Sequence, residues 1–235
     1  MAVLKDLNDM EKPREKALQF GLKALSNTEL IALILRTGTK GKSVLELAQD
    51  VLNLTGGLRG LARSDIYELS QIPGISKIRA LELLACFEMS RRLRYEEAVN
   101  TSAMQSPQKI VDWLQLEIGN SHKEEFLVLF LDAQFHMISY EILFEGTADQ
   151  SHVYEREIFR EAVLRDCSNI ILVHNHPSGN VNPSQADMHL TGKMILMGHM
   201  MGVRICDHLI ISGNDYFSFN SNHLMDLCVD EAMEK

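Results

Sequence analysis

Residues 170–187 read IILVHNHPSGNVNPSQAD and carry the strongest structural signal in the chain. The apolar residues at the start are typical of a buried β-strand. Because side chains alternate between the two faces of a strand, His174 and His176 should project to one side and Asn175 to the other. The prolines and the glycine that follow then end the strand. The stretch therefore predicts two neighbouring imidazoles at the end of a strand.

A helix should begin directly after this turn. Ser184 and Asp187 form the Ser-x-x-Asp pattern of a helix N-terminus, and the two positions share one helix face. Two imidazoles and one carboxylate can hold zinc and leave a fourth position for water, whose pKa zinc lowers to roughly 7. A histidine pair or a helix cap alone is more often structural. Their combination in one short block predicts a hydrolytic zinc site with the ligands His174, His176 and Asp187.

This block resembles the signature of JAMM, or MPN-plus, metalloproteases, in which seven residues lie between the second histidine and Ser-x-x-Asp. The Pro-Ser-Gly after the histidines and the later stretch Cys206-Asp207-His208-Leu209 resemble the bacterial RadC family, also called UPF0758 and historically labelled as DNA repair proteins. The resemblance covers nearly the whole chain. It implies an α/β (α+β) JAMM/MPN-like sandwich, with a mixed sheet and flanking helices, preceded by a small all-α helix-hairpin-helix domain.

By the same resemblance, a glutamate on an earlier strand acts as general acid and base through the zinc-bound water. The segment EEFLVLFLD resembles that strand, and the family pattern favours Glu124 over Glu125. Strand alternation makes the choice important, because only one of two neighbours can face the metal. The resemblance also implies that Ser184 stabilises the oxyanion, in addition to capping its helix. On a later alternating strand, Asp207 and His208 could support the ligands from behind.

Competing catalytic motifs are missing or incomplete. The sequence has no His-Glu-x-x-His, and its four cysteines form no Cys-x-x-Cys, which argues against the zincin and zinc-deaminase patterns. Residues 38–43, GTKGKS, resemble a phosphate-binding loop, but Arg36 stands where the first glycine is required. We interpret this stretch as a basic turn.

The composition is that of a folded protein with one large or two small domains. Of the 235 residues, 46% are hydrophobic and 23% are charged. No apolar run approaches the ~20 residues of a membrane span, and the N-terminus lacks a secretory core. We therefore expect a cytoplasmic protein without membrane contact. The four scattered cysteines agree with reduced thiols in that compartment.

Charge and turn residues divide the chain near residue 100. Residues 1–95 carry 15 Lys and Arg against 11 Asp and Glu, whereas residues 96–235 carry 8 against 21. The polar stretch between the two halves is typical of a linker. We predict three parts, a helical domain at residues 1–98, the zinc hydrolase domain at residues 103–225 and a C-terminal tail at residues 226–235.

Helix signals dominate the first domain. Cap residues predict helices at residues 27–35 and 43–54 and a short one from residue 64. Residues 69–80, LSQIPGISKIRA, resemble a helix-hairpin-helix, whose turn presents backbone N–H groups to a nucleic-acid phosphate. Basic side chains nearby would strengthen a non-specific, salt-dependent contact with DNA, namely Lys77, Arg79, Arg91, Arg92 and Arg94. The same module can equally serve for packing or protein contact.

The second domain mixes strand and helix signals. Periodicity predicts helices at residues 155–166 and 184–201, and strands at residues 126–131, 137–144, 170–174, 203–211 and near residue 216. The leading functional hypothesis is a zinc-dependent peptidase or isopeptidase acting on a protein or peptide substrate. The alternative is a DNA-associated accessory protein with a structural or vestigial zinc, and hydrolysis of phosphodiesters ranks third. Substrate and oligomeric state stay open.

Overall fold

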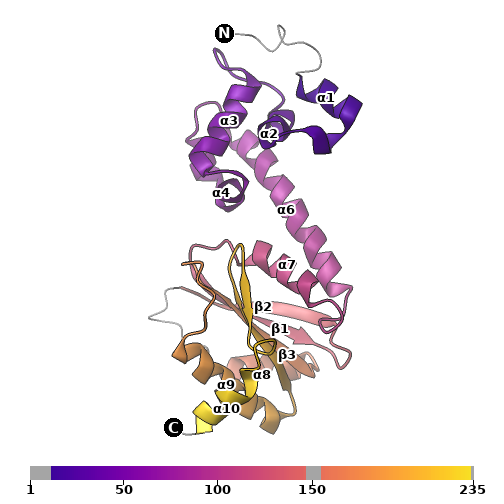
Figure 1. The fold of residues 1–235 in the computed structure, drawn as a ribbon, viewed down its shortest axis with the longest axis vertical. Helices are drawn as coiled ribbons and strands as arrows, with labels where there is room; N and C mark the ends of the chain where they lie inside the picture. Colours follow the sequence, from indigo (N-terminus) through magenta and orange to yellow (C-terminus); the bar gives the residue numbers. More distant parts are fainter. Residues whose placement is uncertain (1–11, 147–154, 234–235) are drawn as a thin grey trace. The chain divides into compact units, whose positions relative to one another are not determined.

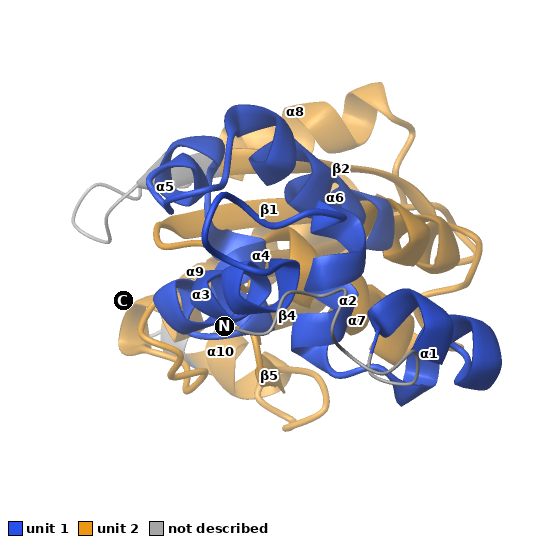
Figure 2. Ribbon diagram, turned by 90° about the horizontal axis from the view of Figure 1, so that it is seen from above, with its two compact units in different colours: residues 1–90 blue, residues 91–235 orange. Residues whose placement is uncertain are grey.

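The computed structural model describes residues 12–146 and 155–233 (Figure 1). Residues 1–11 of the predicted helical domain and residues 234–235 of the predicted tail lie outside the described residues. The chain forms two compact units, residues 1–90 and residues 91–235 (Figure 2).

The division between the units falls inside helix α6 (Lys77–Val99), earlier than the predicted boundary at residue 98. The last turns of α6 belong to the second unit, where the ring of Tyr95 packs against Trp113 with centroids 5.2 Å apart. A continuous helix therefore carries the chain from one unit into the next.

The first unit consists of short helices around one apolar core. Its elements before α6 are α1 (Pro13–Phe20), the 3₁₀ turn η3 (Leu22–Ala24), α2 (Asn27–Leu35), α3 (Val44–Thr55), α4 (Leu58–Arg63) and α5 (Ile66–Ser70). Capping boxes begin α2, α3 and α5, because Ser26, Ser43 and Asp65 each accept the N–H of a glutamate three residues later. The helices predicted from these caps are confirmed, whereas α1 and α4 were not predicted.

The hairpin between α5 and α6 packs on the basic turn at residues 38–43. Gly74 has φ 101°, and a Cβ there would lie 2.6 Å from Cγ2 of Thr39 and 3.1 Å from Cδ1 of Leu47. Only glycine fits this backbone conformation and this close approach. At the start of α6 the hydroxyl of Ser76 accepts the N–H of Arg79 at 3.3 Å.

The second unit contains a mixed five-stranded sheet in the order β2-β1-β3-β4-β5. β1 pairs antiparallel with β2 and β3, β3 pairs parallel with β4, and β4 pairs antiparallel with β5. The strands are β1 (Glu124–Leu131), β2 (Met137–Gly146), β3 (Asn169–Asn175), β4 (Arg204–Ile211) and β5 (Tyr216–Ser218). The predicted α/β fold with a mixed sheet is confirmed.

Helices cover both faces of this sheet (Figure 1). Leu127, Leu129 and Val173 pack with α7 (Pro107–Glu117) on one face. Phe126 and Leu172, from the alternate positions, pack on the other face with α8 (Glu155–Leu164) and α9 (Gln185–Met201). His174 continues the second set, two residues after Leu172, so the predicted ligands lie on the face that α9 covers.

Two elements of this unit were not predicted. α7 begins at a proline after Ser106 and buries Ile110, Val111 and Leu114 at helical spacing, a signal present in the sequence. Of the residues predicted as a C-terminal tail, 226–233 lie in the helix α10 (Met225–Met233). α10 packs directly on α9, where a Cβ at Gly192 would lie 1.9 Å from the carbonyl oxygen of Cys228.

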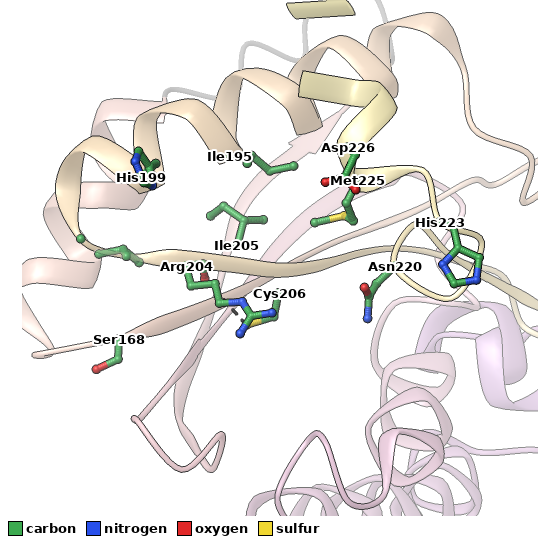
Figure 3. A pocket seen from close by; sticks show the side chains of 13 residues that line it. Ser168, Ile195, His199, Arg204, Ile205, Cys206, Asn220, His223, Met225 and Asp226 are labelled. Atoms are coloured by element: carbon green, nitrogen blue, oxygen red, sulfur yellow. Dashed lines mark hydrogen bonds between the residues drawn. The ribbon is translucent and has the colours of Figure 1, made fainter. Parts of the chain in front are cut away.

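A cavity of about 570 Å³ lies beside the end of α9 and the start of β4 (Figure 3). His199, Arg204 and Asp226 contribute polar groups to its wall, and Ile195 and Ile205 contribute apolar ones. None of the predicted ligands or catalytic residues lines this cavity. Within the part of the chain that the structure describes, no helix combines the length and the apolar character needed to cross a membrane.

Candidate metal centre

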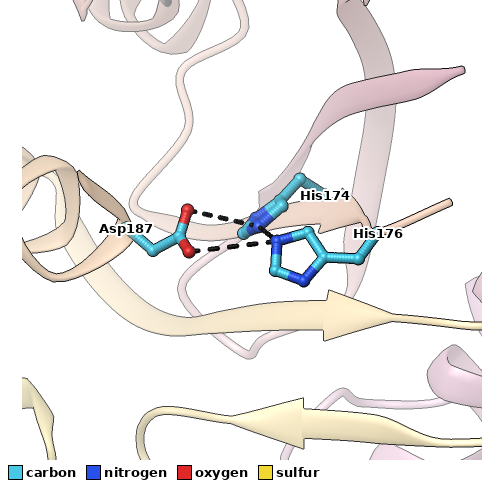
Figure 4. Close-up of side chains that lie close together, drawn as sticks. All are labelled: His174, His176 and Asp187. Carbon is cyan, nitrogen blue, oxygen red and sulfur yellow. Dashed lines mark hydrogen bonds and ion pairs between the residues drawn. The ribbon is translucent and has the colours of Figure 1, made fainter. Parts of the chain in front are cut away.

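The fold brings the three predicted ligands together (Figure 4). His174 lies near the end of β3, His176 follows just beyond it, and Asp187 lies in the first turn of α9. Nε2 of His174 is 3.0 Å from Nε2 of His176 and 3.3 Å from Oδ1 of Asp187. Nε2 of His176 is 3.9 Å from Oδ2 of Asp187. Three side chains from two elements thus converge on one point.

The donor set fits zinc. Zinc binds nitrogen and oxygen ligands at about 2.0–2.2 Å with tetrahedral geometry, so two of its ligand atoms should lie roughly 3.3 Å apart. The distances of 3.0, 3.3 and 3.9 Å require only small side-chain shifts to reach that value. Two imidazoles and one carboxylate also leave a position open, which is typical of catalytic zinc sites.

Burial favours the neutral form of His174, which is the form that binds a metal. The side chain of His174 is 2% exposed, and this burial lowers its pKa to about 4, although the Asp187 carboxylate acts in the opposite direction. His208 lies behind it, fully buried, and burial lowers its pKa well below the usual value. Only a neutral imidazole has a lone pair to offer a metal. The pKa shift therefore keeps His174 ready to bind a cation near neutral pH.

The loop that follows His176 orients its ring. Nδ1 of His176 lies 2.6 Å from the carbonyl oxygen of Asn180. Because a carbonyl only accepts, Nδ1 carries the proton and Nε2 keeps its lone pair on the side of Asp187. The loop curls back because Gly179, with φ 81°, donates its N–H to the carbonyl of His176 at 2.9 Å.

Strand pairing distinguishes Glu124 from Glu125. β1 and β3 pair antiparallel with Phe126 opposite His174, which places residue 124 on the same face as both histidines. The ring of Phe126 stacks over His174 with centroids 6.3 Å apart and marks that face. Burial raises the pKa of Glu124, while the charge of His176 lowers it and that of Asp187 raises it. By strand alternation, Glu125 faces away from the ligands.

Asn175, between the two histidines, holds the backbone on either side of Glu124. Its Oδ1 accepts the N–H of Glu125 at 2.7 Å, and its Nδ2 donates to the carbonyl of Lys123 at 3.0 Å. The side chain of Asn175 is buried. One carboxamide thereby fixes the two peptide groups that flank the candidate base, a role that the sequence reasoning did not identify.

Ser184 caps α9 and also contacts the acidic ligand. Its hydroxyl donates to Oδ2 of Asp187 at 2.6 Å, and the N–H of Ser184 donates to the same oxygen at 2.7 Å. The capping box leaves Oδ1 of Asp187 directed at His174. Ser184 is thus adjacent to the centre, and in this geometry its hydroxyl proton is used to orient the ligand.

The residues expected to support the ligands from behind differ in their contacts. His208 contacts His174, with Nε2 of His208 2.9 Å from Nδ1 of His174. Asp207 does not reach the ligands. Its carboxylate accepts the hydroxyl of Ser218 at 2.6 Å and the N–H of Asn220 at 2.9 Å, so it stabilises the end of β5. The expectation that Asp207 also supports the metal centre is wrong, because alternation on β4 turns it to the other face.

Most of the basic side chains predicted to meet DNA have partners within the protein. Arg79 donates to the carbonyl oxygens of Gly74 and Thr37, both at 2.8 Å. Three further members of the cluster also have partners, namely Arg91, Arg92 and Arg94. The guanidinium of Arg79 thereby joins the hairpin to the turn after α2, and its contact with a nucleic-acid phosphate stays a prediction.

Comparisons with known proteins agree with the two-part organisation. Residues 104–224 match the RadC-like JAB domain, and residues 4–81 match the UPF0758 N-terminal region. A UPF0758 protein of Methylibium petroleiphilum is 40% identical over 222 residues, which cover 94% of this chain and 100% of the relative. A UPF0758 protein of Alkaliphilus oremlandii is 39% identical over 223 residues, covering 94% and 96%. One of Chlorobaculum parvum is 37% identical over 220 residues, covering 94% and 98%.

Proposed function

Because this chain belongs to the UPF0758 family, whose C-terminal part is a RadC-like JAB domain, we propose that it is a zinc-dependent hydrolase that cleaves an amide bond in a protein or peptide substrate. One observation carries the proposal. The ligand atoms of His174, His176 and Asp187 all lie within 4.8 Å of one another, on an arrangement that leaves a coordination position open.

Each proposed role follows from a position in the fold. His174, His176 and Asp187 would hold the zinc, which when bound supplies a water of lowered pKa and polarises a substrate carbonyl. Glu124 faces the same side of the sheet, and its raised pKa suits a carboxyl group that must accept a proton and then return it. Ser184 lies at the edge of the centre, and its hydroxyl, which here donates to Oδ2 of Asp187, would turn to the negative charge on the substrate oxygen once that carboxylate binds zinc.

Paired variants separate binding from catalysis. His174→Ala should lose zinc, because two of three donors cannot retain it, whereas Glu124→Gln should keep zinc and lose cleavage. Glu125→Gln is the matched control, and it should keep both. Elemental analysis measures zinc, and a proteomic comparison of cells that carry wild type or Glu124→Gln identifies the uncleaved substrate. Glu124→Gln that cleaves as fast as wild type would disprove the assigned role.

For the first unit we propose a separate, non-specific contact with DNA through the turn between α5 and α6. The supporting observation is the hairpin itself, in which Gly74 permits the close turn and Ser76 caps α6. Lys77 begins α6 and supplies charge at that end. Binding should weaken as salt rises and should persist in His176→Ala. Loss of binding in Lys77→Ala, with no change in Lys193→Ala, would place the contact in the first unit.

A further inference from the structure

We propose that His208 and Thr191 hold His174 in its metal-binding tautomer before any metal arrives. The proposal rests on the zinc function above and extends it to two positioning residues outside the ligand set. A histidine can bind zinc through Nε2 only when the ring proton sits on Nδ1, so a device that fixes this proton prepares the site.

A chain of buried hydrogen bonds runs behind the ligands. Nδ1 of His174 is 2.9 Å from Nε2 of His208. Nδ1 of His208 is 2.6 Å from the hydroxyl of Thr191, which lies 2.6 Å from the main-chain carbonyl oxygen of Asp187. His208 and Thr191 are both fully buried. The chain therefore starts at one ligand and ends at the backbone of another.

With both histidines neutral, only one distribution of protons satisfies every link of this chain. The carbonyl of Asp187 can only accept, so the hydroxyl of Thr191 must donate to it. Because its one proton is then used, Thr191 accepts from Nδ1–H of His208. Nε2 of His208 is left as an acceptor and takes the Nδ1–H of His174. The lone pair of His174 is thus on Nε2, the atom that lies 3.3 Å from Oδ1 of Asp187.

Packing holds both rings in this orientation. The ring of His208 stacks on Phe219 with centroids 4.9 Å apart and an interplanar angle of 18°, and the edge of Phe126 lies on another side at 6.0 Å. Phe126 also stacks on His174. A 180° flip of either imidazole ring would move its N–H away from the acceptor, and a buried N–H without an acceptor is costly. The aromatic contacts therefore protect the tautomer.

The two ligand histidines both carry their ring proton on Nδ1, but different groups accept that proton. His176 donates its Nδ1–H to a single loop carbonyl, that of Asn180, and its side chain is 21% exposed. His174 is 2% exposed and has no carbonyl at that position, since the side chain of His208 occupies it. His208 can accept the proton of His174 only if its own ring proton lies on Nδ1. Thr191 accepts that Nδ1–H and so keeps the proton there.

The tautomers can be measured directly in metal-free protein. Long-range ¹H–¹⁵N spectra of ¹⁵N-histidine-labelled wild type should show His174 and His208 with protonated Nδ1 and unprotonated Nε2. The two rings are assigned from the signals lost in His174→Asn and in His208→Phe. A proton on Nε2 of His174 in the metal-free wild type would overturn the proposal without any variant having to fold.

Variants then test the consequence for zinc affinity, measured by competition with a chromophoric chelator. Thr191→Val keeps the volume but removes the acceptor of His208, and zinc affinity should fall by about 10–100-fold. Thr191→Ser is the matched control, which keeps the hydroxyl and should bind within about threefold of wild type. Near-UV circular dichroism checks that both variants are folded.

His208→Phe removes the acceptor of His174 and provides a second route to the same result. The double variant Thr191→Val, His208→Phe should bind zinc no more weakly than the weaker single variant, because both changes break one chain. Thr191→Val that binds as tightly as Thr191→Ser would overturn the proposal. Wild type that shows the expected tautomers but binds no zinc would instead disprove the zinc function and support the tautomer assignment.

Discussion

Three consecutive residues, His174 and Asn175 at the end of β3 and His176 just beyond it, project alternately to the two faces of the sheet. His174 and His176 face α9 and supply nitrogen ligands, whereas Asn175 faces the other way and binds the backbone of β1. The carboxamide matches the N–H and the C=O that a neighbouring strand would otherwise pair. Replacing any one of the three should therefore have a distinct effect.

Asn175→Ala should lower stability without removing a ligand. It removes two part-buried hydrogen bonds, those to the N–H of Glu125 and to the carbonyl of Lys123, and each such bond contributes about 0.5–1.5 kcal/mol. The free energy of unfolding, measured by urea denaturation with an unchanged m-value, should fall accordingly. Asn214→Ala, in an exposed loop, is the control and should be close to wild type. Equal stability of the two variants would contradict this role for Asn175.

At the scale of elements, α9 links the metal centre to the C-terminal helix. Ser184 caps its first turn, which contains Asp187, and Gly202 in the left-handed conformation ends it with φ 71°. Between these ends, Gly192 allows the backbone of α10 to approach closely. The contact explains why residues 226–233, which were predicted as part of a C-terminal tail, lie in a helix, since most helical stability comes from packing.

Gly192→Ala should disrupt this contact. In an exposed helix the change would stabilise by about 1 kcal/mol, because alanine has the higher helix propensity. Here the new Cβ would lie 1.9 Å from the carbonyl oxygen of Cys228, so we expect a loss of about 1–3 kcal/mol or more in the free energy of unfolding. Met200→Ala, at a position that is 77% exposed on the same helix, is the control. A gain in stability for Gly192→Ala would show that α10 does not pack as described.

At the scale of the whole molecule, the buried histidines make folding sensitive to pH. Burial lowers the pKa of His174 to about 4 and that of His208 well below the usual value. In the unfolded chain both should titrate near about 6.5. Between these values the unfolded state binds more protons than the folded state, so the free energy of unfolding falls as the pH falls.

The effect is best measured as a difference between two proteins. Zinc-free wild type should lose stability between pH 6.5 and about 4 more steeply than His208→Phe, which lacks one of the two groups. A comparison of two proteins is needed because burial also raises the pKa of Glu124 and Asp207. These carboxyl groups increase the free energy of unfolding as the pH falls, and so oppose the effect of the histidines. Chemical denaturation at a series of pH values gives both curves. Parallel curves would mean that His208 is not buried in its neutral form.

Local signals in the sequence were sufficient for most elements. The capped helices α2, α3 and α9 and the strands β1 and β3 follow from cap residues and from periodicity, which depend only on neighbours along the chain. The His-x-His pair and Ser-x-x-Asp also lie within one short stretch, so their convergence could be predicted. α7 carried a readable helical pattern, whereas α10 depends on a partner 36 residues away at the contact of Gly192 with Cys228.

The sequence by itself therefore determined which side chains share a face, because face is a property of local periodicity. Which faces meet was decided only by the tertiary structure. Pairing of β1 with β3 places Glu124, and not Glu125, on the same face as His174, which lies 50 positions later. From the sequence, the choice between the two glutamates had rested only on a family resemblance. Parallel pairing of β4 with β3 brings His208 beside His174, 34 residues away, and α9 adds Thr191. Such contacts arise from strand order and helix packing, which no short window of sequence contains.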